Sequence, residues 1–179
     1  MPRAPRGRLD ISDTAIKRAI ELSSSSPNAD CFTFIKEDFF TWRPTELFDL
    51  IFDYLFFCCI EPDMRSAWAS QMRDLLKPWG AHNPNIPGHD YLCPYDHVGG
   101  PPYKLSIADY EELLHPMGFE AVSVAENKLA VGPRKGNELI GRWKKVVNND
   151  RTIAVEENRI GNALKPSYLH AILHSYTLS

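Results

Sequence analysis

Hydrophobic residues in the first half of the chain follow two patterns, one typical of helices and one typical of buried strands. Apolar side chains recur three and four residues apart after Ser12 and again after Glu61, which predicts two amphipathic helices. Residues 31–36 have strand composition, and residues 48–54 are almost continuously apolar, as expected for a parallel strand covered on both faces. This alternation of strands and helices predicts an α/β sheet.

Polar residues mark where several of these elements begin and end. Residues 8–11 are expected to be extended, and Ser12 is a good N-cap for a helix that ends at the serine-rich stretch 23–28. Ser106 is the expected N-cap of a further helix that ends before Pro116 and Gly118. The short apolar segments 121–124 and 129–131 are then expected to form an antiparallel pair at the edge of a mixed sheet.

Two stretches resist assignment. Residues 81–102 fall where an alternating pattern would place the next parallel strand, yet no strand fits them because they hold five prolines: Pro84, Pro87, Pro94, Pro101 and Pro102. Residues 146–179 mix weak helix and strand signals without a clear apolar face. We therefore expect a long loop at the first stretch and a peripheral tail at the second.

Composition narrows the class of protein. The 179 residues are 44% hydrophobic and 24% charged, a profile typical of a soluble globular domain. Twenty Lys and Arg against 23 Asp and Glu give a net charge of −3, so general attraction to nucleic acid or anionic lipid is not expected. The apolar stretch 47–60 is shorter than the roughly 20 residues of a membrane-spanning helix.

The cysteines indicate the compartment. The four cysteines have no C-x-x-C spacing, which argues against a disulfide framework or a zinc site. We predict a reducing compartment, and the cytoplasm in particular. The basic N-terminus has no apolar segment typical of a secretory signal, although part of an organelle transit peptide remains an alternative.

Candidate chemistry lies at the strand ends, because ligands of open parallel sheets bind outside the carboxyl ends of their strands. Asp10 follows an early strand, where a carboxylate commonly accepts hydrogen bonds from both ribose hydroxyls of a nucleotide-like cofactor. Asp38 and Phe39 end the next strand, and such a pair could accept from an adenine amino group and pack on its ring. Asp53 and Tyr54 end the strand after that.

The chain also resembles a known family. It is similar to the plant thiol and halide methyltransferases, which belong to the thiopurine methyltransferase-like group of S-adenosylmethionine enzymes. The resemblance rests on LDIS at 9–12, KEDFFTWRP at 36–44, FDLIFDY at 48–54, EPDMR at 61–65, DHVGGPPYK at 96–104 and GPRKG at 132–136.

The resemblance implies a fold, a cofactor and an activity. The fold would be Rossmann-like, and the reaction would transfer a methyl group from S-adenosylmethionine to a small-molecule thiol, bisulfide or halide ion. By resemblance, Asp10 would hold the cofactor ribose, Asp38 and the Phe39 backbone would hold the adenine, and Tyr54 would line the cofactor. Tyr103 would lie over the methyl group as the catalytic residue, with no metal ion involved.

The sequence departs from the family before Asp10, over residues 81–95 and after residue 145. The family's first strand and Gly-rich turn are expected before Asp10, where only nine residues stand, so the fold is expected to be incomplete. The expected organisation is a partial methyltransferase domain over 1–145, with 81–95 divergent, followed by a divergent tail over 146–179. An inactive remnant that acts through protein interaction is therefore the alternative to an enzyme.

Structural roles compete with the functional ones. Asp10 could only flank the helix, Asp38 and Phe39 could form a strand-end turn and part of the core, and Tyr54 could fill the core equally well. Asp53 is best interpreted as a structural acceptor for nearby backbone N–H groups.

The remaining polar candidates have weaker support. Tyr103 could merely stack on the neighbouring prolines, and His97 could assist deprotonation but is more simply a solvated loop residue. His170 and His174 could share a helical face, yet two histidines without a third ligand give a weak metal signal. Cys58 and Cys59 are most simply buried small apolar residues.

Overall fold

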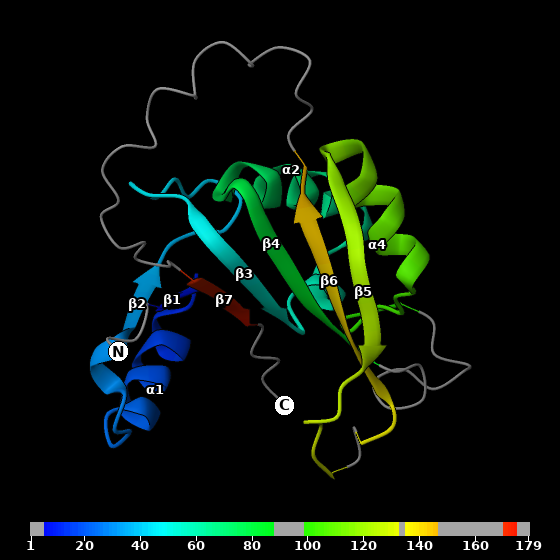
Figure 1. Ribbon diagram of the computed structural model, residues 1–179. Coiled ribbons are helices and arrows are strands. Elements are labelled where there is room, and N and C mark those ends of the chain that lie inside the picture. The colour runs from blue at the N-terminus through cyan, green and yellow to red at the C-terminus, as the bar shows by residue number, and fades with distance from the viewer. Residues whose placement is uncertain (1–5, 88–98, 133–134, 147–169, 175–179) are drawn as a thin grey trace, which may run out of the picture.

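In the described part of the chain, three α-helices accompany a seven-stranded sheet, and Figure 1 shows how they are arranged. The computed structural model describes residues 6–87, 99–132, 135–146 and 170–174. The strand order across the sheet is β2-β1-β7-β3-β4-β6-β5. The elements are β1 (Arg6–Asp10), α1 (Asp13–Ser23), β2 (Phe32–Lys36), β3 (Phe48–Tyr54), α2 (Arg65–Leu75), β4 (Leu76–Pro87), α4 (Ile107–Leu114), β5 (Phe119–Glu126), β6 (Glu138–Lys145) and β7 (His170–His174).

The sheet is mixed. Strands β2, β1, β7, β3 and β4 pair in parallel, and β6 and β5 continue the sheet as an antiparallel pair. From β1 to β2 the chain moves toward one edge of the sheet, whereas from β3 through β4 it moves toward the other. The position between β1 and β3, which β7 occupies, is therefore the topological switch point.

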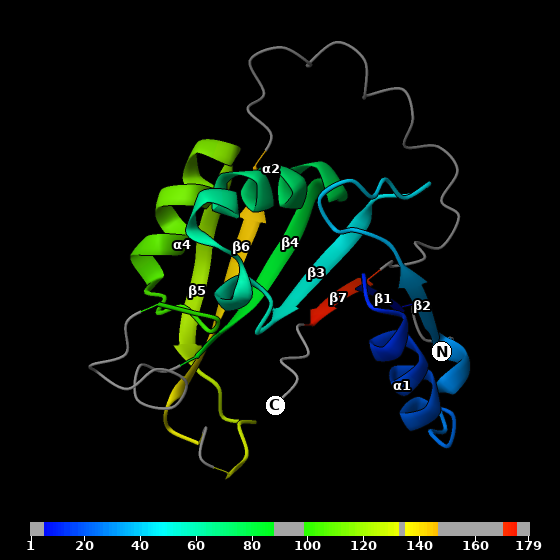
Figure 2. The ribbon, with the colours of Figure 1, turned by 180° about the vertical axis from the view of Figure 1, so that it is seen from behind.

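The hydrophobic core lies between the sheet and the pair α2 and α4. Figure 2 shows these two helices side by side over strands β3 to β5. Their inward side chains pack with residues of β3, β5 and β6, and the largest side chains that are fully buried are Trp68, Trp143, Tyr110, Phe48, Phe57 and Phe119. Helix α1 packs separately, against β1 and β2.

Several predicted elements are confirmed. The strand over 48–54 has the predicted bounds. Ser12 caps α1, since its hydroxyl oxygen accepts a hydrogen bond from the Ala15 N–H. Ser106 and Asp109 form a reciprocal capping box at the start of α4, and the chain leaves that helix through Gly118 in the left-handed region at φ 81°.

The loop predicted for residues 81–102 is wrong in its first part, because β4 continues to Pro87. Between the pairs Phe48↔Leu76 and Leu50↔Ala81, the chain advances five residues along β4 but only two along β3. β4 therefore bulges there. Pairing with β6 covers 81–82 and 85–87, and Pro84 falls between those two runs. Pairing on both sides thus outweighs the local cost of proline. Residues 88–98 lie outside the described part of the chain.

The predicted edge hairpin is correct for its first strand and wrong for its second. β5 pairs antiparallel with β6, which begins at Glu138, rather than with residues 129–131. Leu129 and Val131 are 88% and 78% exposed in the connection between these strands. β6 was missed because its alternation of buried Gly141 and Trp143 with exposed neighbours is a weak apolar signal.

The interpretation of residues 146–179 as a peripheral tail is wrong for five of them. β7 lies inside the sheet, where His170–His174 pairs with β1 on one side and β3 on the other. The sheet is consequently continuous at the position where the sequence predicts a missing strand. The division into a domain over 1–145 and a divergent tail remains a prediction.

Candidate active site

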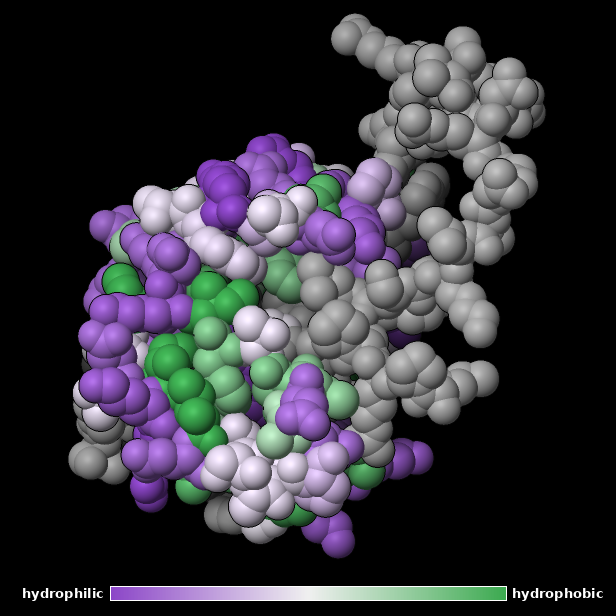
Figure 3. Space-filling model, turned by 90° about the vertical axis from the view of Figure 1, so that its left-hand side faces the viewer, coloured by the Kyte–Doolittle hydropathy of each residue, from purple (hydrophilic) through white to green (hydrophobic). Residues whose placement is uncertain are grey.

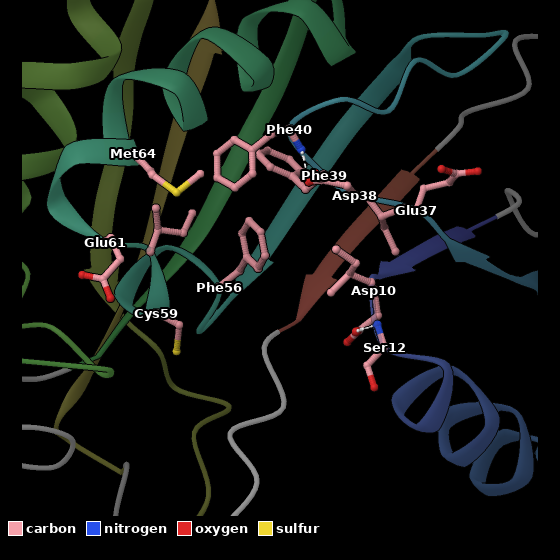
Figure 4. A pocket seen from close by; sticks show the side chains of 13 residues that line it. Asp10, Ser12, Glu37, Asp38, Phe39, Phe40, Phe56, Cys59, Glu61 and Met64 are labelled. Atoms are coloured by element: carbon pink, nitrogen blue, oxygen red, sulfur yellow. Dashed lines mark hydrogen bonds between the residues drawn. The ribbon is translucent and has the colours of Figure 1, made fainter.

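A hollow of about 510 Å³ opens at the carboxyl ends of β1 and β2 and beside the turn that follows β3. This volume lies within the range of roughly 300–1,000 Å³ typical of small-molecule and cofactor sites. Figure 4 shows two walls, with β7 running between them. One wall carries Asp10, Ser12, Asp38 and Phe39, and the other carries Phe56, Cys59, Glu61 and Met64.

Two half-buried carboxylates define the first wall. Asp10 Oδ1 accepts a hydrogen bond of 2.7 Å from the Ser12 N–H, and Asp38 Oδ1 accepts one of 2.9 Å from the Phe40 N–H. Each carboxylate is thus held in place by the hydrogen bond that its Oδ1 accepts. Among the described residues, Oδ2 of each has no hydrogen-bond partner, so both carboxylates can accept hydrogen bonds from a ligand.

Phe39 both lines this hollow and belongs to the core. Its side chain is 5% exposed, and its ring meets the rings of Phe40 and Phe56 edge-on at centroid distances of 5.2 and 5.0 Å. Edge contacts of this kind hold aromatic rings in a defined orientation. The contact between Phe39 and Phe56 joins the two walls of the hollow.

Asp53 is buried and holds the turn that forms part of the second wall. Its Oδ1 accepts hydrogen bonds from the Phe56 N–H at 3.0 Å and the Phe57 N–H at 3.3 Å, which confirms its structural interpretation. The turn it ties down includes Leu55 at φ 62°, a left-handed conformation that a branched side chain rarely adopts. Burial raises the pKa of the Asp53 carboxyl to about 7.

Tyr54 lies apart from the other predicted cofactor residues. It lines a second hollow of about 500 Å³ together with residues 127 and 129–132 and the buried carboxylate of Glu138. Its ring stacks on Phe52 at a centroid distance of 6.3 Å. The structure therefore groups Asp10, Asp38 and Phe39 but places Tyr54 at a different surface.

Tyr103 reaches the rim of the first hollow through Glu61. The tyrosine hydroxyl donates to Glu61 Oε2, and the Tyr103 N–H donates to the Cys58 carbonyl at 2.6 Å. The hydrogen bond to Glu61 raises the pKa of Tyr103. A Cβ at Gly100 would come within 2.5 Å of the tyrosine ring, so glycine is required for this loop to hold the ring. The loop thus anchors Tyr103 beside the hollow, and the ring is not itself among the residues that line it.

The histidine candidates gain no support. His170 and His174 lie in a strand rather than a helix, and residues four apart in a strand are separated by roughly 13 Å. His97 lies outside the described residues. Within the described part of the chain, no three His, Cys, Asp or Glu residues are grouped as metal ligands. No described helix is long and apolar enough to span a membrane.

Ten of the 13 residues that line the hollow were not predicted as site residues, and those on the second wall include Phe56, Cys59, Glu61 and Met64. Cys59 was interpreted as buried, but it is only half-buried and faces the hollow, whereas Cys58 is 2% exposed as expected. The available signal was the EPDMR motif at 61–65, which begins seven residues after the strand that ends at Tyr54.

Solved structures with the same architecture include several methyltransferases. The glycopeptide N-methyltransferase MtfA in complex with S-adenosyl-L-homocysteine matches with a TM-score of 0.62 and 11% identity over 79% of this chain and 83% of its own. The CcbJ methyltransferase from Streptomyces caelestis matches with a TM-score of 0.59 and 13% identity over 80% and 84%. The chain therefore has the Rossmann-like fold of S-adenosylmethionine-dependent methyltransferases, as predicted.

Sequence comparison places the chain within that class. It belongs to the thiopurine S-methyltransferase (TPMT) family, whose profile matches residues 7–148. Thiocyanate methyltransferase 1 of Arabidopsis thaliana is 58% identical over 139 residues, and probable thiol methyltransferase 2 of the same plant is 54% identical over 138. These matches cover 77% and 76% of the chain, which spans 59% and 58% of the respective relatives.

Proposed function

We propose that this chain binds S-adenosylmethionine in the hollow between Asp10 and Glu61 and transfers its methyl group to a thiol-type acceptor. The observation that carries the proposal is the pair of fixed carboxylates at the ends of β1 and β2, each with one oxygen left to accept hydrogen bonds. Family membership supports the reaction class, and the names of the relatives support thiols and thiocyanate as acceptors.

The residues fit the parts of the cofactor. Asp10 would accept hydrogen bonds from the ribose hydroxyls, Asp38 from the adenine amino group, and Phe39 with its backbone would border the ring. The carboxylate of Glu61, on the opposite wall, favours a cationic sulfonium nearby. S-adenosylmethionine supplies a methyl group already activated by its sulfonium sulfur.

The chain's own task is then to position an acceptor and exclude water. Tyr103, held at the rim by Glu61 and Cys58, would cover the acceptor side of the hollow. A soft anion such as thiocyanate, bisulfide or iodide needs no general base, whereas a neutral thiol must lose its proton first. We therefore propose anionic sulfur acceptors and halides, in the cytoplasm, where the thiols of Cys31, Cys58 and Cys59 would stay reduced.

Calorimetric titration with S-adenosylhomocysteine tests the binding step. Asp10→Ala removes a charge-assisted acceptor and is expected to weaken binding by about 10- to 100-fold. Asp13→Ala is the matched control, because Asp13 lies three residues away, pairs with Lys36 and does not line the hollow. Equal affinity in both variants, or no binding by the unmodified chain, contradicts the proposal.

Product analysis tests the acceptor. The chain is incubated with S-adenosylmethionine and, in separate reactions, thiocyanate, bisulfide and iodide, and methylated products are measured by gas chromatography. Methylation of the sulfur anions alone narrows the proposal to sulfur acceptors. Binding of S-adenosylhomocysteine without any methylated product contradicts the proposed transfer step.

A further inference from the structure

The two walls of the proposed cofactor site lie on strands that do not pair with each other. β1 carries Asp10 and β3 leads into the turn with Phe56, and β7 stands between them. Residues 170–173 pair with Arg6–Leu9 on one side, and residues 170–174 pair with Leu50–Tyr54 on the other. β7 is therefore the backbone link between the two parts of the sheet.

The other described contacts between the β2–β1 part of the sheet and the part that begins at β3 are made by side chains. Phe39 meets Phe56 edge-on at 5.0 Å, and Leu9 joins the buried cluster that includes Ile51. The connection from β2 to β3 is further tied to α2, since Gln71 donates to the Trp42 carbonyl at 2.8 Å. These contacts hold the walls near each other, but they do not set the register or spacing of β1 against β3. Only a strand in the slot does that.

We propose that the slot between β1 and β3 is a strand-binding site, filled here by the chain's own segment His170–His174, and that its occupancy controls cofactor affinity. Recognition occurs by strand addition, in which backbone hydrogen bonds on both sides supply the affinity, and the centre of the added segment is the apolar sequence Ala-Ile-Leu. The other parallel strands, β1 to β4, follow one another in the chain, whereas β7 comes later, after the antiparallel strands β5 and β6.

This arrangement makes the cofactor site conditional on the segment. With β7 in place, the ends of β1 and β3 are one strand apart, the spacing across which Asp10 and the Phe56 turn face each other. With β7 out of the slot, β1 and β3 each lose one ladder and expose an unpaired edge. Cofactor affinity is thus coupled to occupancy of the slot. The coupling rests on the proposed function, but the occupancy of the slot by residues 170–174 does not depend on it.

Hydrogen exchange of the unmodified full chain tests the occupancy directly. Backbone N–H groups of a strand paired on both sides alternate between its two neighbours, so the amides of residues 171–173 are expected to exchange as slowly as those of β3. Fast exchange at 171–173 overturns the proposal. Slow exchange at 171–173 that becomes fast on dilution, as the molar mass in light scattering falls from dimer to monomer, also overturns it, because the strand would then come from a second copy.

Ile172→Pro tests the coupling, with Ile172→Val as the matched control. Proline removes a ladder N–H in the middle of a central strand, so amide exchange in residues 7–9 and 50–54 is expected to rise roughly 100-fold while β5 and β6 keep their protection. Valine keeps the N–H and the branched side chain, so exchange stays as in the unmodified chain. Unchanged exchange in the proline variant overturns the assignment of this segment to the slot.

Titration of the same two variants with S-adenosylhomocysteine separates the two proposals. The expected result is affinity about tenfold or more weaker in Ile172→Pro and unchanged in Ile172→Val. If the exchange results hold but the unmodified chain binds no S-adenosylhomocysteine, the proposed function fails and the strand site stands. If the proline variant binds as tightly as the valine variant, the coupling is wrong.

Discussion

Two regions of the molecule differ sharply in how they are packed. In the α1 region, residues 6–36, the buried hydrophobic side chains among the described residues are Leu9 and Ala19. Ile20 and Leu22 of α1 are 48% and 63% exposed. Figure 3 views the molecule from this side and shows hydrophobic surface open between polar patches. In the α2–α4 region, residues 48–146, Trp68 and Trp143 are fully buried.

The α2–α4 region is further organised by a chain of aromatic contacts. Phe57 stacks on Trp68 at 4.1 Å and meets Tyr110 at 4.8 Å, and Tyr110 stacks on Trp143 at 5.6 Å. The α1 region has two phenylalanines of β2 beneath the Arg8 guanidinium instead. Local stability follows buried contacts, so the α1 region is expected to open more readily than the rest of the fold. The hollow lies between the two regions. The wall with Phe56 and Glu61 belongs to the well-packed α2–α4 region, called the firm wall below, and the wall with Asp10 belongs to the α1 region, which is expected to open more readily.

The largest contrast is expected from side-chain truncation. Trp68→Ala empties a fully buried position and should lower the free energy of unfolding by about 3–5 kcal/mol, whereas Leu22→Ala on exposed α1 should change it by less than about 0.5 kcal/mol. Urea denaturation followed by circular dichroism measures both. Comparable losses in the two variants would show that the regions are equally packed.

Ligand binding should reduce the contrast. S-adenosylhomocysteine at 100 times its Kd should add about 2.7 kcal/mol to the free energy of unfolding. Because the ligand joins Asp10 and Asp38 to the firm wall, the slowing of amide exchange should be largest in residues 6–36. Exchange mass spectrometry with and without ligand measures this, and slowing confined to α2 and α4 would place the ligand elsewhere.

Asp53 should give the firm region a pH dependence that the α1 region lacks. Its pKa is about 7 in the folded chain against 3.8 unfolded, so the folded state binds the proton more tightly. The resulting stability is fully present below the unfolded pKa and is lost as pH rises through about 7. The difference in unfolding free energy between pH 5 and pH 7.5 should therefore be smaller in Asp53→Asn, which keeps an acceptor for the Phe56 and Phe57 N–H groups. An unchanged difference, measured by urea denaturation, would contradict the assignment.

The smallest effects should come from the two helix caps. Ser106→Ala removes half of a capping box and should cost about 1 kcal/mol of global stability. Ser12→Ala removes the cap of α1, and its cost of about 1 kcal/mol should appear as faster exchange in α1 alone. Exchange at the amides of both helices distinguishes these outcomes, and a global loss from Ser12→Ala would contradict the idea that α1 opens separately.

Sequence reasoning succeeded where one local signal decided the structure. The apolar run of β3 and the capping box at Ser106 and Asp109 need no distant partner to be recognised. β4 and β7 were missed because neither resembles a strand locally. β4 contains prolines, β7 lies in a stretch of mixed helix and strand signals, and each is a strand because it pairs on two sides.

The candidate site shows the same limit. Topology brings Asp10 and Asp38 together, since parallel strands end at one edge of a sheet, and this was predictable. Tyr54 lines a different hollow from these two carboxylates, and its assignment to the cofactor stays a prediction, because consecutive residues of a strand point to opposite faces. Cys59 and Glu61 were missed because the turn that aims them is fixed by Asp53 beneath it.

The position of β7 also sets an order of events during synthesis. β1, α1 and β2 leave the ribosome early, but the strand that pairs β1 to β3 is made after every other described strand. Until then, two apolar strand edges stand open to solvent and to neighbouring chains. Closure depends on pairing between Arg6–Leu9 and residues 170–173, which are far apart in the sequence, and such contacts form slowly. The nascent chain is thus exposed to aggregation until residues 170–174 are available to pair, and a chaperone that shields strand edges would raise its yield.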